Sequence, residues 1–334
     1  MSKVGIPRAL LYYQYYPVWR SFFEHLGAEV VTSPPTNRTI LTAGISRAVA
    51  DTCLPVKVFL GHTISLIGKC DYIFIPSMTS FGKKTYNCSK IIGLPNITRA
   101  VLPECPIILD PNIDLERGRW YFYHQIYKLA SHFTSNPIKM KKTIDVAWQK
   151  QLAYRKKMSD EKITSNQALS GLYENSHSAS SQKNPQGNLT IALLGHPYIT
   201  NDEYLNHRII YHLQNMGANV LTSEMAPQAA IDAAAIRAVG ETHWAFEPDI
   251  IGAGQYYTEM KVDGIITLSA FGCGPDSMMM VWVEHRAKET KTPFLPLSLD
   301  EHSSGGAMLT RLEAFLDMIK RKGTKLPTPT PAYC

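Results

Sequence analysis

Two segments of this chain recur at a constant distance, and this repeat is the strongest constraint on its fold. Residues 4–7 (Val-Gly-Ile-Pro) recur as 194–197 (Leu-Gly-His-Pro), and residues 23–33 recur as 213–223. Both pairs are offset by 190 residues, so the two anchors align without a gap. Each copy has a short apolar strand, a Gly-x-Pro turn, an amphipathic helix ending at a glycine, and a second β-branched strand. The same β-α-β unit is therefore predicted twice.

Further strands extend the repeat with looser similarity. Residues 71–77 correspond to 263–269, and residues 106–110 correspond to 293–297, each pair being typical of a buried parallel strand. Strands that alternate with helices predict an α/β, doubly wound fold. We therefore expect two Rossmann-like domains related by internal duplication and joined by a helical connecting segment, with a helix over 305–321 closing the second domain.

The composition between the two copies differs from that of the copies themselves. Residues 115–158 have helical character, whereas residues 159–189 are poor in apolar groups and indicate a flexible linker. The predicted organisation is an N-terminal Rossmann-like domain at 1–135, a helical and flexible linker at 136–188, a C-terminal Rossmann-like domain at 189–325 and a tail at 326–334.

Composition and charge exclude several classes of protein. Hydrophobic residues make up 45% of the 334 residues and charged residues 19%, which is typical of a globular chain and excludes disorder. The net charge of +6 is spread along the chain without an aromatic-interleaved basic motif, so nucleic acid is not an expected partner. Because no apolar stretch approaches the roughly 20 residues of a membrane span and no signal-peptide block is visible, a cytoplasmic protein is expected.

The six cysteines fall into groups by their position relative to the predicted strands. They are too sparse for a disulfide scaffold, and none forms a Cys-x-x-Cys pair. Ligands of doubly wound folds bind beyond the carboxyl ends of the strands. Cys70 and Cys105 precede strands, so they are interpreted as small buried thiols at the opposite end. Cys53, Cys88 and Cys273 lie in loops on the cleft side, where they can converge between the two domains.

Three such thiols are compatible with more than one kind of site. Zinc takes four ligands, and candidates for the fourth are His62, His196, His285 and His302. A [4Fe–4S] cluster is usually held by four cysteines, so three would leave one iron open to an external ligand. Widely separated cysteines in loops rich in Gly and Pro favour a cluster over a compact zinc module. Three unrelated structural cysteines are the remaining interpretation.

Several segments, in order along the chain, carry a resemblance to a known family. They are residues 7–10 (Pro-Arg-Ala-Leu), 51–55 (Asp-Thr-Cys-Leu-Pro), 195–198 (Gly-His-Pro-Tyr), 269–277 (Ser-Ala-Phe-Gly-Cys-Gly-Pro-Asp-Ser), 300–306 (Asp-Glu-His-Ser-Ser-Gly-Gly) and 310–315 (Thr-Arg-Leu-Glu-Ala-Phe). Together they resemble the 2-hydroxyacyl-CoA dehydratase, benzoyl-CoA reductase and double-cubane cluster protein superfamily, and most closely its branch related to acyl-CoA dehydratase activases. The resemblance covers nearly the whole chain apart from residues 155–188 and the tail.

The resemblance implies a cofactor and a partner. It implies an iron–sulfur cluster, most simply one [4Fe–4S] cluster per subunit, held in the interdomain cleft by Cys53, Cys88 and Cys273. A larger double-cubane cluster is implied only if subunits or further cysteines contribute ligands. It also implies an anaerobic homodimer served by a partner ATPase, the activase, as electron donor. The sequence itself has no Gly-x-x-x-x-Gly-Lys loop, so ATP hydrolysis is expected of that partner.

Residues around the cysteines have alternative interpretations. Gly272 and Gly274 leave backbone N–H groups free to approach a cluster sulfide, and the ammonium group of Lys57 would raise a cluster's potential. These three are therefore candidate cofactor-binding residues, although Lys57 can equally be an ordinary solvated lysine. Glu301 and His302 follow a strand at the cleft lip and are candidate catalytic proton carriers. The alternative is that their loop only caps the next helix.

Three functional hypotheses follow. The first is an iron–sulfur redox protein, an oxidoreductase in electron transfer, that accepts electrons from the activase and passes them to a substrate or another metal centre. The second is a non-catalytic cluster carrier or scaffold that helps to assemble or activate another enzyme. The third is a zinc-bound or metal-free binding module. Arg8, Asp202 and Glu203, in loops after matching strands, are weaker candidates for the site.

Overall fold

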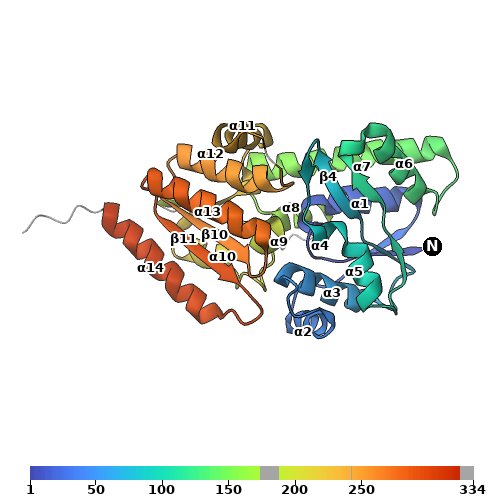
Figure 1. Cartoon of the computed structure of the whole chain (residues 1–334), viewed down its shortest axis with the longest axis horizontal. Coiled ribbons are helices and arrows are strands. Elements are labelled where there is room, and N and C mark those ends of the chain that lie inside the picture. Colours follow the sequence, from blue (N-terminus) through green and yellow to red (C-terminus); the bar gives the residue numbers. More distant parts are fainter. Residues whose placement is uncertain (174–187, 242, 324–334) are drawn as a thin grey trace, which may run out of the picture.

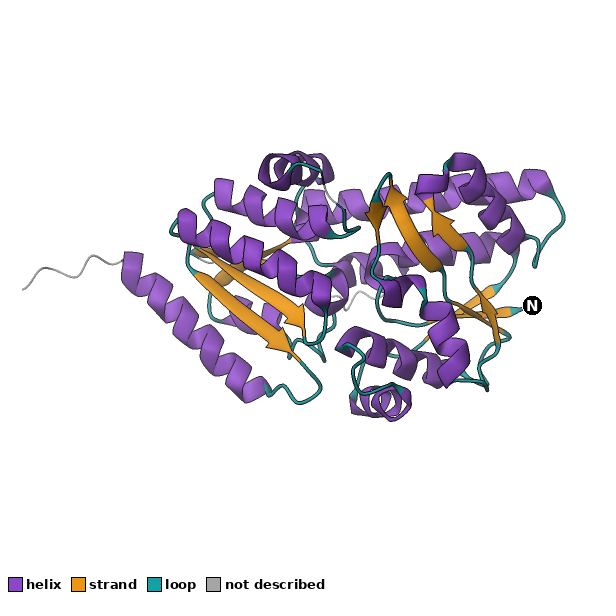
Figure 2. Cartoon of the chain, viewed as in Figure 1, coloured by secondary structure: helices purple, strands orange, loops and turns teal. Residues whose placement is uncertain are grey.

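The computed structural model describes residues 1–173, 188–241 and 243–323, and this part of the chain contains two four-stranded sheets. Figures 1 and 2 show how the helices surround them. The first has the order β2-β1-β3-β6, with strands β1 (Lys3–Ile6), β2 (Glu29–Thr32), β3 (Tyr72–Phe74) and β6 (Ile107–Leu109). The second has the order β9-β8-β10-β11, with strands β8 (Leu189–Leu194), β9 (Ala218–Thr222), β10 (Gly264–Ala270) and β11 (Phe294–Leu299). All pairs in both sheets are parallel, which confirms the predicted α/β, Rossmann-like fold.

The two sheets arrange their strands in the same chain order. In each half the first strand lies between the second and the third, and the fourth lies beside the third. The helices of the two repeats are followed by Gly27 and Gly217, whose φ angles are 94° and 82°. A residue without a Cβ is favoured in this left-handed region, which is why a glycine marks the helix end in both copies. Internal duplication as the origin of this likeness stays a prediction.

Helix α1 (Tyr12–Leu26) contains a proline, and a neighbouring helix compensates for it. Pro17 has no N–H, so it cannot donate to the carbonyl of Tyr13 one turn earlier. The hydroxyl of Tyr154, on helix α7 (Pro137–Glu161), donates to that carbonyl at 2.6 Å instead. The missing bond of one helix is therefore replaced by a buried side chain of another.

The equivalent helix of the second half is broken into α9 (Pro197–Thr200) and α10 (Ile209–Asn215). We expected one continuous helix, but polar side chains in the intervening residues bind backbone groups. Asp202 Oδ1 accepts from the N–H groups of residues 204 and 205, both at 3.1 Å, and Asn206 Nδ2 donates to the carbonyls of Ile199 and Thr200. Such local bonds compete with helical ones, so the chain turns away before it re-enters a helix.

The connecting segment between the halves is mostly helical. Helix α7 packs along α1, and helix α8 (Ser165–Tyr173) follows it. The sequence had indicated a flexible linker over 159–189. The structure instead buries Ala168 and Leu169 within α8, while residues 174–187 lie outside the described part of the chain. Lys162, between the two helices, donates to the carbonyl of Met225 at 2.7 Å, so this segment also contacts the second half.

The other helices cover the sheets and connect the strands. Those of the first half are α2 (Arg38–Arg47), α3 (Leu54–Leu66), α4 (Ser89–Ile92), α5 (Leu94–Val101) and α6 (Arg119–Ala130). Those of the second half are α11 (Gln228–Val239), α12 (Ala253–Glu259), α13 (Gly274–Glu289) and α14 (Gly305–Gly323), with a π-helical turn at Pro248–Gly252. Successive residues of β10 face opposite sides: Ile265 packs with residues of α11–α13, and Ile266 belongs to the larger core, which is continuous with the first half.

A small third sheet, which the sequence did not predict, joins the two halves. It has the order β5-β4-β7, with strands β4 (Ser77–Gly82), β5 (Thr85–Tyr86) and β7 (Asn112–Asp114). The N–H of Tyr86 donates to the carbonyl of His243, and its carbonyl accepts from the N–H of Ala245, both at 2.9 Å. These bonds fix the start of the loop that carries Cys88 against the second half.

Candidate functional site

The three cysteines predicted as metal ligands occupy equivalent positions at helix starts. Cys53 immediately precedes α3, Cys88 precedes α4 and Cys273 precedes α13. Each has extended backbone geometry, and none uses its side chain to cap the helix. Their thiols are therefore free of the usual capping role, and the first two come from one half of the chain while the third comes from the other.

The structure brings these three loops together at the junction of the halves. Gly272 has φ +78°, a left-handed geometry that favours glycine, and a Cβ placed there would be in ordinary contact with the Cα of Cys53 at 3.6 Å, so the two loops lie side by side. Cys88 and Cys273 line the same small cavity. Gly274 begins α13, and a Cβ there would meet open space, so no close approach requires this glycine. The three loops meet at this junction, and the role of the cysteines as ligands stays a prediction.

A buried contact between a histidine and an aspartate completes this junction. His196, immediately before α9, places its Nε2 atom 2.7 Å from Oδ1 of Asp276, and both side chains are buried, with 3% and 0% exposed. The imidazole stacks on Tyr198 at a centroid distance of 4.8 Å, and Phe246 meets it edge-on at 5.0 Å. The other carboxylate oxygen, Oδ2, accepts from the backbone N–H of residue 270 at 3.0 Å, which fixes the carboxylate at the end of β10.

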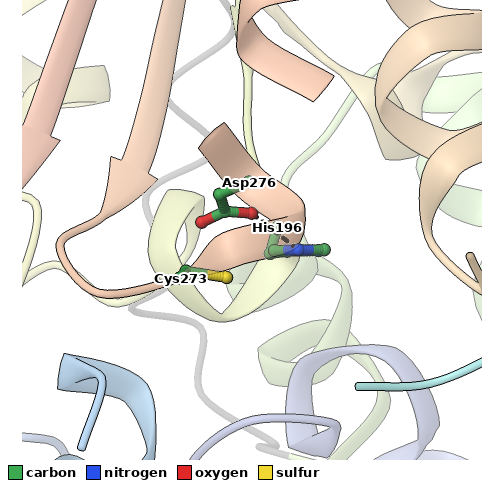
Figure 3. Close-up of side chains that lie close together, drawn as sticks. All are labelled: His196, Cys273 and Asp276. Carbon is green, nitrogen blue, oxygen red and sulfur yellow. Dashed lines mark ion pairs between the residues drawn. The ribbon is translucent and has the colours of Figure 1, made fainter. Parts of the chain in front are cut away.

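Cys273 belongs to the same group of side chains. Figure 3 shows the three side chains together, with the sulfur of Cys273 directed toward His196. One ligand atom from each of His196, Cys273 and Asp276 lies within 4.8 Å of the other two. In the described part of the chain, this is the one group of three or more His, Cys, Asp or Glu side chains that meets this distance. His196 was one of four sequence candidates. Asp276 was not assigned a role, although an acidic residue in the first turn after a Gly-Pro helix start was a usable signal.

The electrostatic environment keeps two of the thiols protonated. Burial raises the pKa of the Cys53 thiol, and burial together with the charge of Asp276 raises the pKa of the Cys273 thiol. Burial and the same carboxylate also raise the pKa of Tyr198 far above its ordinary value. These groups are neutral at neutral pH unless a cation lies between them, so they are not pre-formed thiolate nucleophiles.

Of the remaining predicted site residues, Lys57 and Glu301 form an ion pair, and His302 is exposed to solvent. Lys57 Nζ lies 2.7 Å from Oε1 of Glu301, so the candidate cofactor-binding and catalytic side chains are partners in an ion pair. His302 is exposed, and its backbone N–H donates to Oδ1 of Asp300. Ser303 Oγ donates to the same atom at 2.9 Å, so this loop forms a closed turn before α14.

A second polar contact between the halves surrounds Asp202. Thr36 donates from its hydroxyl to Oδ2 of Asp202 and contacts Nε2 of His62 at 2.9 Å, and Nδ1 of His62 lies 2.8 Å from the hydroxyl of Ser33. Burial, and then the charge of Arg8, lower the pKa of His62 to about 3. Burial raises the pKa of Asp202 to about 6, against the hydrogen bonds that it accepts. A cavity of about 840 Å³ lies beside this chain of side chains.

The two cysteines interpreted as structural lie at the opposite end of the first sheet. Cys70 precedes β3 and donates to the carbonyl of Leu66 at 3.4 Å. Cys105 precedes β6, and burial raises the pKa of its thiol to about 11. Both are half-buried and far along the strands from the junction, which makes them suitable controls for the three junction cysteines.

Comparison with known proteins identifies the family. A sequence model of the family described as the CoA enzyme activase uncharacterised domain (DUF2229) matches residues 3–226. This chain belongs to that family. The match covers the first sheet, the connecting helices and the first β-α-β unit of the second half of this activase domain. No curated protein matches its sequence.

The family match corrects the principal functional prediction. We predicted an iron–sulfur electron carrier that accepts electrons from a partner activase. That prediction was wrong, because the chain itself is a CoA enzyme activase domain. The same finding overturns two related predictions. The protein is not described correctly as a double-cubane-type oxidoreductase, and a separate activase ATPase is not its electron donor. Relation to the activases is shown, whereas membership of the superfamily named from the sequence is not.

The error has a physical reason. The motifs that carried the resemblance lie in loops at the carboxyl ends of parallel strands. Rossmann-like chains of any activity place their binding residues there, so these loops do not separate an activase domain from the enzyme that an activase serves. In the structure, moreover, the sulfurs of Cys53, Cys88 and Cys273 are not found as a group within 4.8 Å of one another in the described residues.

Among the described residues, no helix is long and apolar enough to cross a membrane.

Proposed function

We propose that this activase domain helps to activate a CoA-dependent enzyme. Its functional site in this proposal is the junction formed by Cys53, Cys88, Cys273 and His196. The observation that carries the proposal is the meeting of these four residues, each immediately preceding a helix and drawn from both halves of the chain. The family description supports the activating role. The finer relationship to the dehydratase and reductase superfamily is part of this proposal.

The donor set at the junction supports a thiophilic metal centre. Thiolates and imidazoles bind zinc, iron and cobalt in preference to magnesium or calcium. The raised pKa values of Cys53 and Cys273 fit this interpretation, because a bound cation would stabilise thiolates that burial alone disfavours. When bound, such a centre supplies Lewis acidity at the junction. The three cysteines and His196 would hold the two halves around it.

The spacing of the sulfurs bears on the kind of centre. A tetrahedral zinc ion with Zn–S bonds of about 2.3 Å places its sulfur ligands about 3.8 Å apart. Because the three sulfurs are not all within 4.8 Å of one another, one ion could bind all three only if the loops closed further. A polynuclear iron–sulfur cluster bridges more widely spaced thiolates, so the cofactor expected from the sequence remains part of the proposal.

The proposal is tested by metal analysis of the full chain. The protein is purified without oxygen, incubated with Zn²⁺ or with Fe²⁺ and sulfide, desalted, and analysed for metal and sulfide. Wild type is expected to retain metal, and Cys53→Ser, Cys88→Ser and Cys273→Ser are expected to lose most of it. Cys105→Ser is the matched control, because this half-buried cysteine lies at the other end of the sheet. Wild-type protein that retains no metal, or loses it equally in the control, would contradict the metal centre.

The activating role needs its own measurement. The turnover of a CoA-dependent dehydratase is measured with and without this chain. Wild type is expected to raise the turnover, Cys273→Ser to abolish the increase and Cys105→Ser to preserve it. If Cys273→Ser raised the turnover as much as wild type does, the junction would not be needed for activation. No increase with any variant would contradict the activating role itself.

A further inference from the structure

The small cavity at the junction has a chemical lining that the proposed function does not yet explain. Its volume is about 20 Å³, close to the space that one water molecule or one ion requires. Cys88, Cys273, His196 and Asn87 contribute polar groups to its lining, and the other lining residues are aromatic, such as Phe246, or aliphatic, such as Ile91. The cavity is therefore a small, largely apolar space that presents two thiols, one imidazole and one amide.

Two buried acceptors in this lining have no donor. The Nδ1 atom of His196 and the Oδ1 atom of Asn87 are both buried without a hydrogen-bond partner among the described residues. Asn87 donates from Nδ2 to the carbonyl of Met78 at 2.9 Å, so its amide is already oriented with Oδ1 as the unpaired atom. A buried acceptor without a partner destabilises the fold, so a native protein normally provides it with a donor, a water molecule or a cation. A cation in the cavity would satisfy both acceptors.

The position of Asp276 determines which histidine nitrogen is available. Its Oδ1 atom lies 2.7 Å from Nε2, although the ring N–H is not well aligned on it. A carboxylate this close favours the proton on Nε2 by its charge, which leaves the lone pair on Nδ1. The ring nitrogen of a metal-bound histidine that does not bind the metal almost always donates to a carboxylate, a backbone carbonyl or a water molecule.

We propose that Nδ1 of His196 is a nitrogen ligand of the junction metal, beside the sulfur of Cys273, and that Asp276 is the residue that positions it. Cys88 lines the same cavity but does not form a group with His196 and Cys273 within 4.8 Å, so its sulfur could bind the same ion only if its side chain turned further inward. The inference rests on the proposed function, because it names a ligand of that same site. Sulfur and imidazole ligands suit Zn²⁺, Co²⁺ or Fe²⁺. Asn87 also lines this cavity, but the proposal does not require its oxygen as a ligand.

Cobalt is the probe for this ligand set, because Co²⁺ substitutes for Zn²⁺ and its absorption reports sulfur and nitrogen ligands. The full chain is titrated with Co²⁺ under reducing, oxygen-free conditions. Wild type is expected to show thiolate charge-transfer bands and intense d–d bands. His196→Ala is expected to bind Co²⁺ at least about tenfold more weakly and with shifted d–d bands. Asp276→Asn is expected to keep the bands and to lose about 10- to 100-fold in affinity.

Controls separate loss of the ligand from loss of the fold. His285→Ala removes an exposed histidine on α13 and is expected to titrate as wild type. His196→Cys replaces the nitrogen by a sulfur, so it is expected to recover binding with stronger charge-transfer bands. If His196→Ala does not fold, His196→Gln and the ¹¹³Cd chemical shift of the wild-type complex, which distinguishes nitrogen from sulfur ligands, give the same answer.

The outcomes distinguish this inference from the proposed function. If His196→Ala binds Co²⁺ with the affinity and bands of wild type while Cys273→Ser does not bind it, His196 is not a ligand and the metal site stands. If wild type itself shows no Co²⁺ bands, the cavity does not hold a mononuclear metal ion and this inference fails. The proposed function then still stands or falls on metal retention after incubation with Fe²⁺ and sulfide.

Discussion

The Nζ atom of Lys57 lies 2.7 Å from Oε1 of Glu301, and this ion pair joins helix α3 of the first half to the loop after β11 of the second. The two side chains are only 9% and 20% exposed. Lys57 is one turn after Cys53, so the pair also holds the start of α3 near the junction. It therefore belongs to the contacts that position the two halves.

Removing one partner of this ion pair should destabilise the fold. Lys57→Met leaves the Glu301 carboxylate unpaired in a mostly buried place, which we expect to lower the free energy of unfolding by about 1–3 kcal/mol. The double variant Lys57→Met, Glu301→Gln should recover part of this loss, because no lone charge then remains. Urea unfolding of the two single variants and the double variant gives the coupling free energy. Strictly additive losses would show that the two groups do not interact.

The free energy of unfolding should depend on pH through Asp202. Burial raises its pKa from 3.8 to about 6, so between these values the folded state binds more protons than the unfolded state. The contribution of this carboxyl to the free energy of unfolding is therefore largest below pH 3.8 and is lost as the pH rises through 6. Asp202→Asn should be more stable than wild type at pH 7, by on the order of 1–3 kcal/mol.

The measurement is urea unfolding of wild type and Asp202→Asn at pH 5, 6 and 7. The difference between the two proteins should grow with pH over this range. Glu203→Gln, a change of the same kind at the adjacent exposed residue, is the control and should leave the slope unchanged. A difference that shrinks toward pH 7 would mean that the Asp202 carboxylate is stabilised, not penalised, in the folded state.

The bond from Tyr154 to Tyr13 should matter only because Pro17 is present. Tyr154→Phe leaves the Tyr13 carbonyl buried without a donor, at an expected cost of about 1–2 kcal/mol in the free energy of unfolding. In a Pro17→Ala background, the new N–H of residue 17 can donate to that carbonyl, so Tyr154→Phe should cost less. Thermal or urea unfolding of the four proteins in this cycle measures the difference. An equal cost in both backgrounds would show that the hydroxyl does not replace the missing N–H.

The contact between α2 and α3 should not tolerate a methyl group. A Cβ at Gly44 would lie 1.8 Å from the carbonyl oxygen of Lys57, and one at Gly61 would lie 2.0 Å from that of Ile40. Because both obstacles are backbone atoms, Gly61→Ala should lower the free energy of unfolding by at least about 2 kcal/mol, despite the better helix propensity of alanine.

Gly171→Ala on α8 is the matched control for this substitution. There the added Cβ would meet only the flexible end of Lys157, at 2.9 Å, which can move aside. Alanine should therefore be neutral or should stabilise the protein by about 0.5–1 kcal/mol. If Gly61→Ala behaved in the same way in urea unfolding, the two helices would have to be less closely packed than the structure shows.

The sequence by itself determined the strands of the two four-stranded sheets and the ends of those sheets at which particular side chains lie. Runs of apolar and β-branched residues specify buried strands locally, and the repeat offset by 190 residues gave the same pattern twice. Cys53, Cys88 and Cys273 were therefore assigned to the cleft side, and Cys70 and Cys105 to the other. The motifs in the cleft loops did not identify the biochemical role, because strand-end loops of this fold serve many activities.

Only the tertiary structure decided which side chains meet. Lys57 and Glu301 are separated by 244 residues and Thr36 and Asp202 by 166, and no local pattern marks either pair. Asp276 became part of the junction only when the starts of α9 and α13 came together. Strand pattern depends on neighbours along the chain, whereas such contacts depend on how the two halves pack. That is why the scaffold could be predicted from the sequence and the partners at the junction could not.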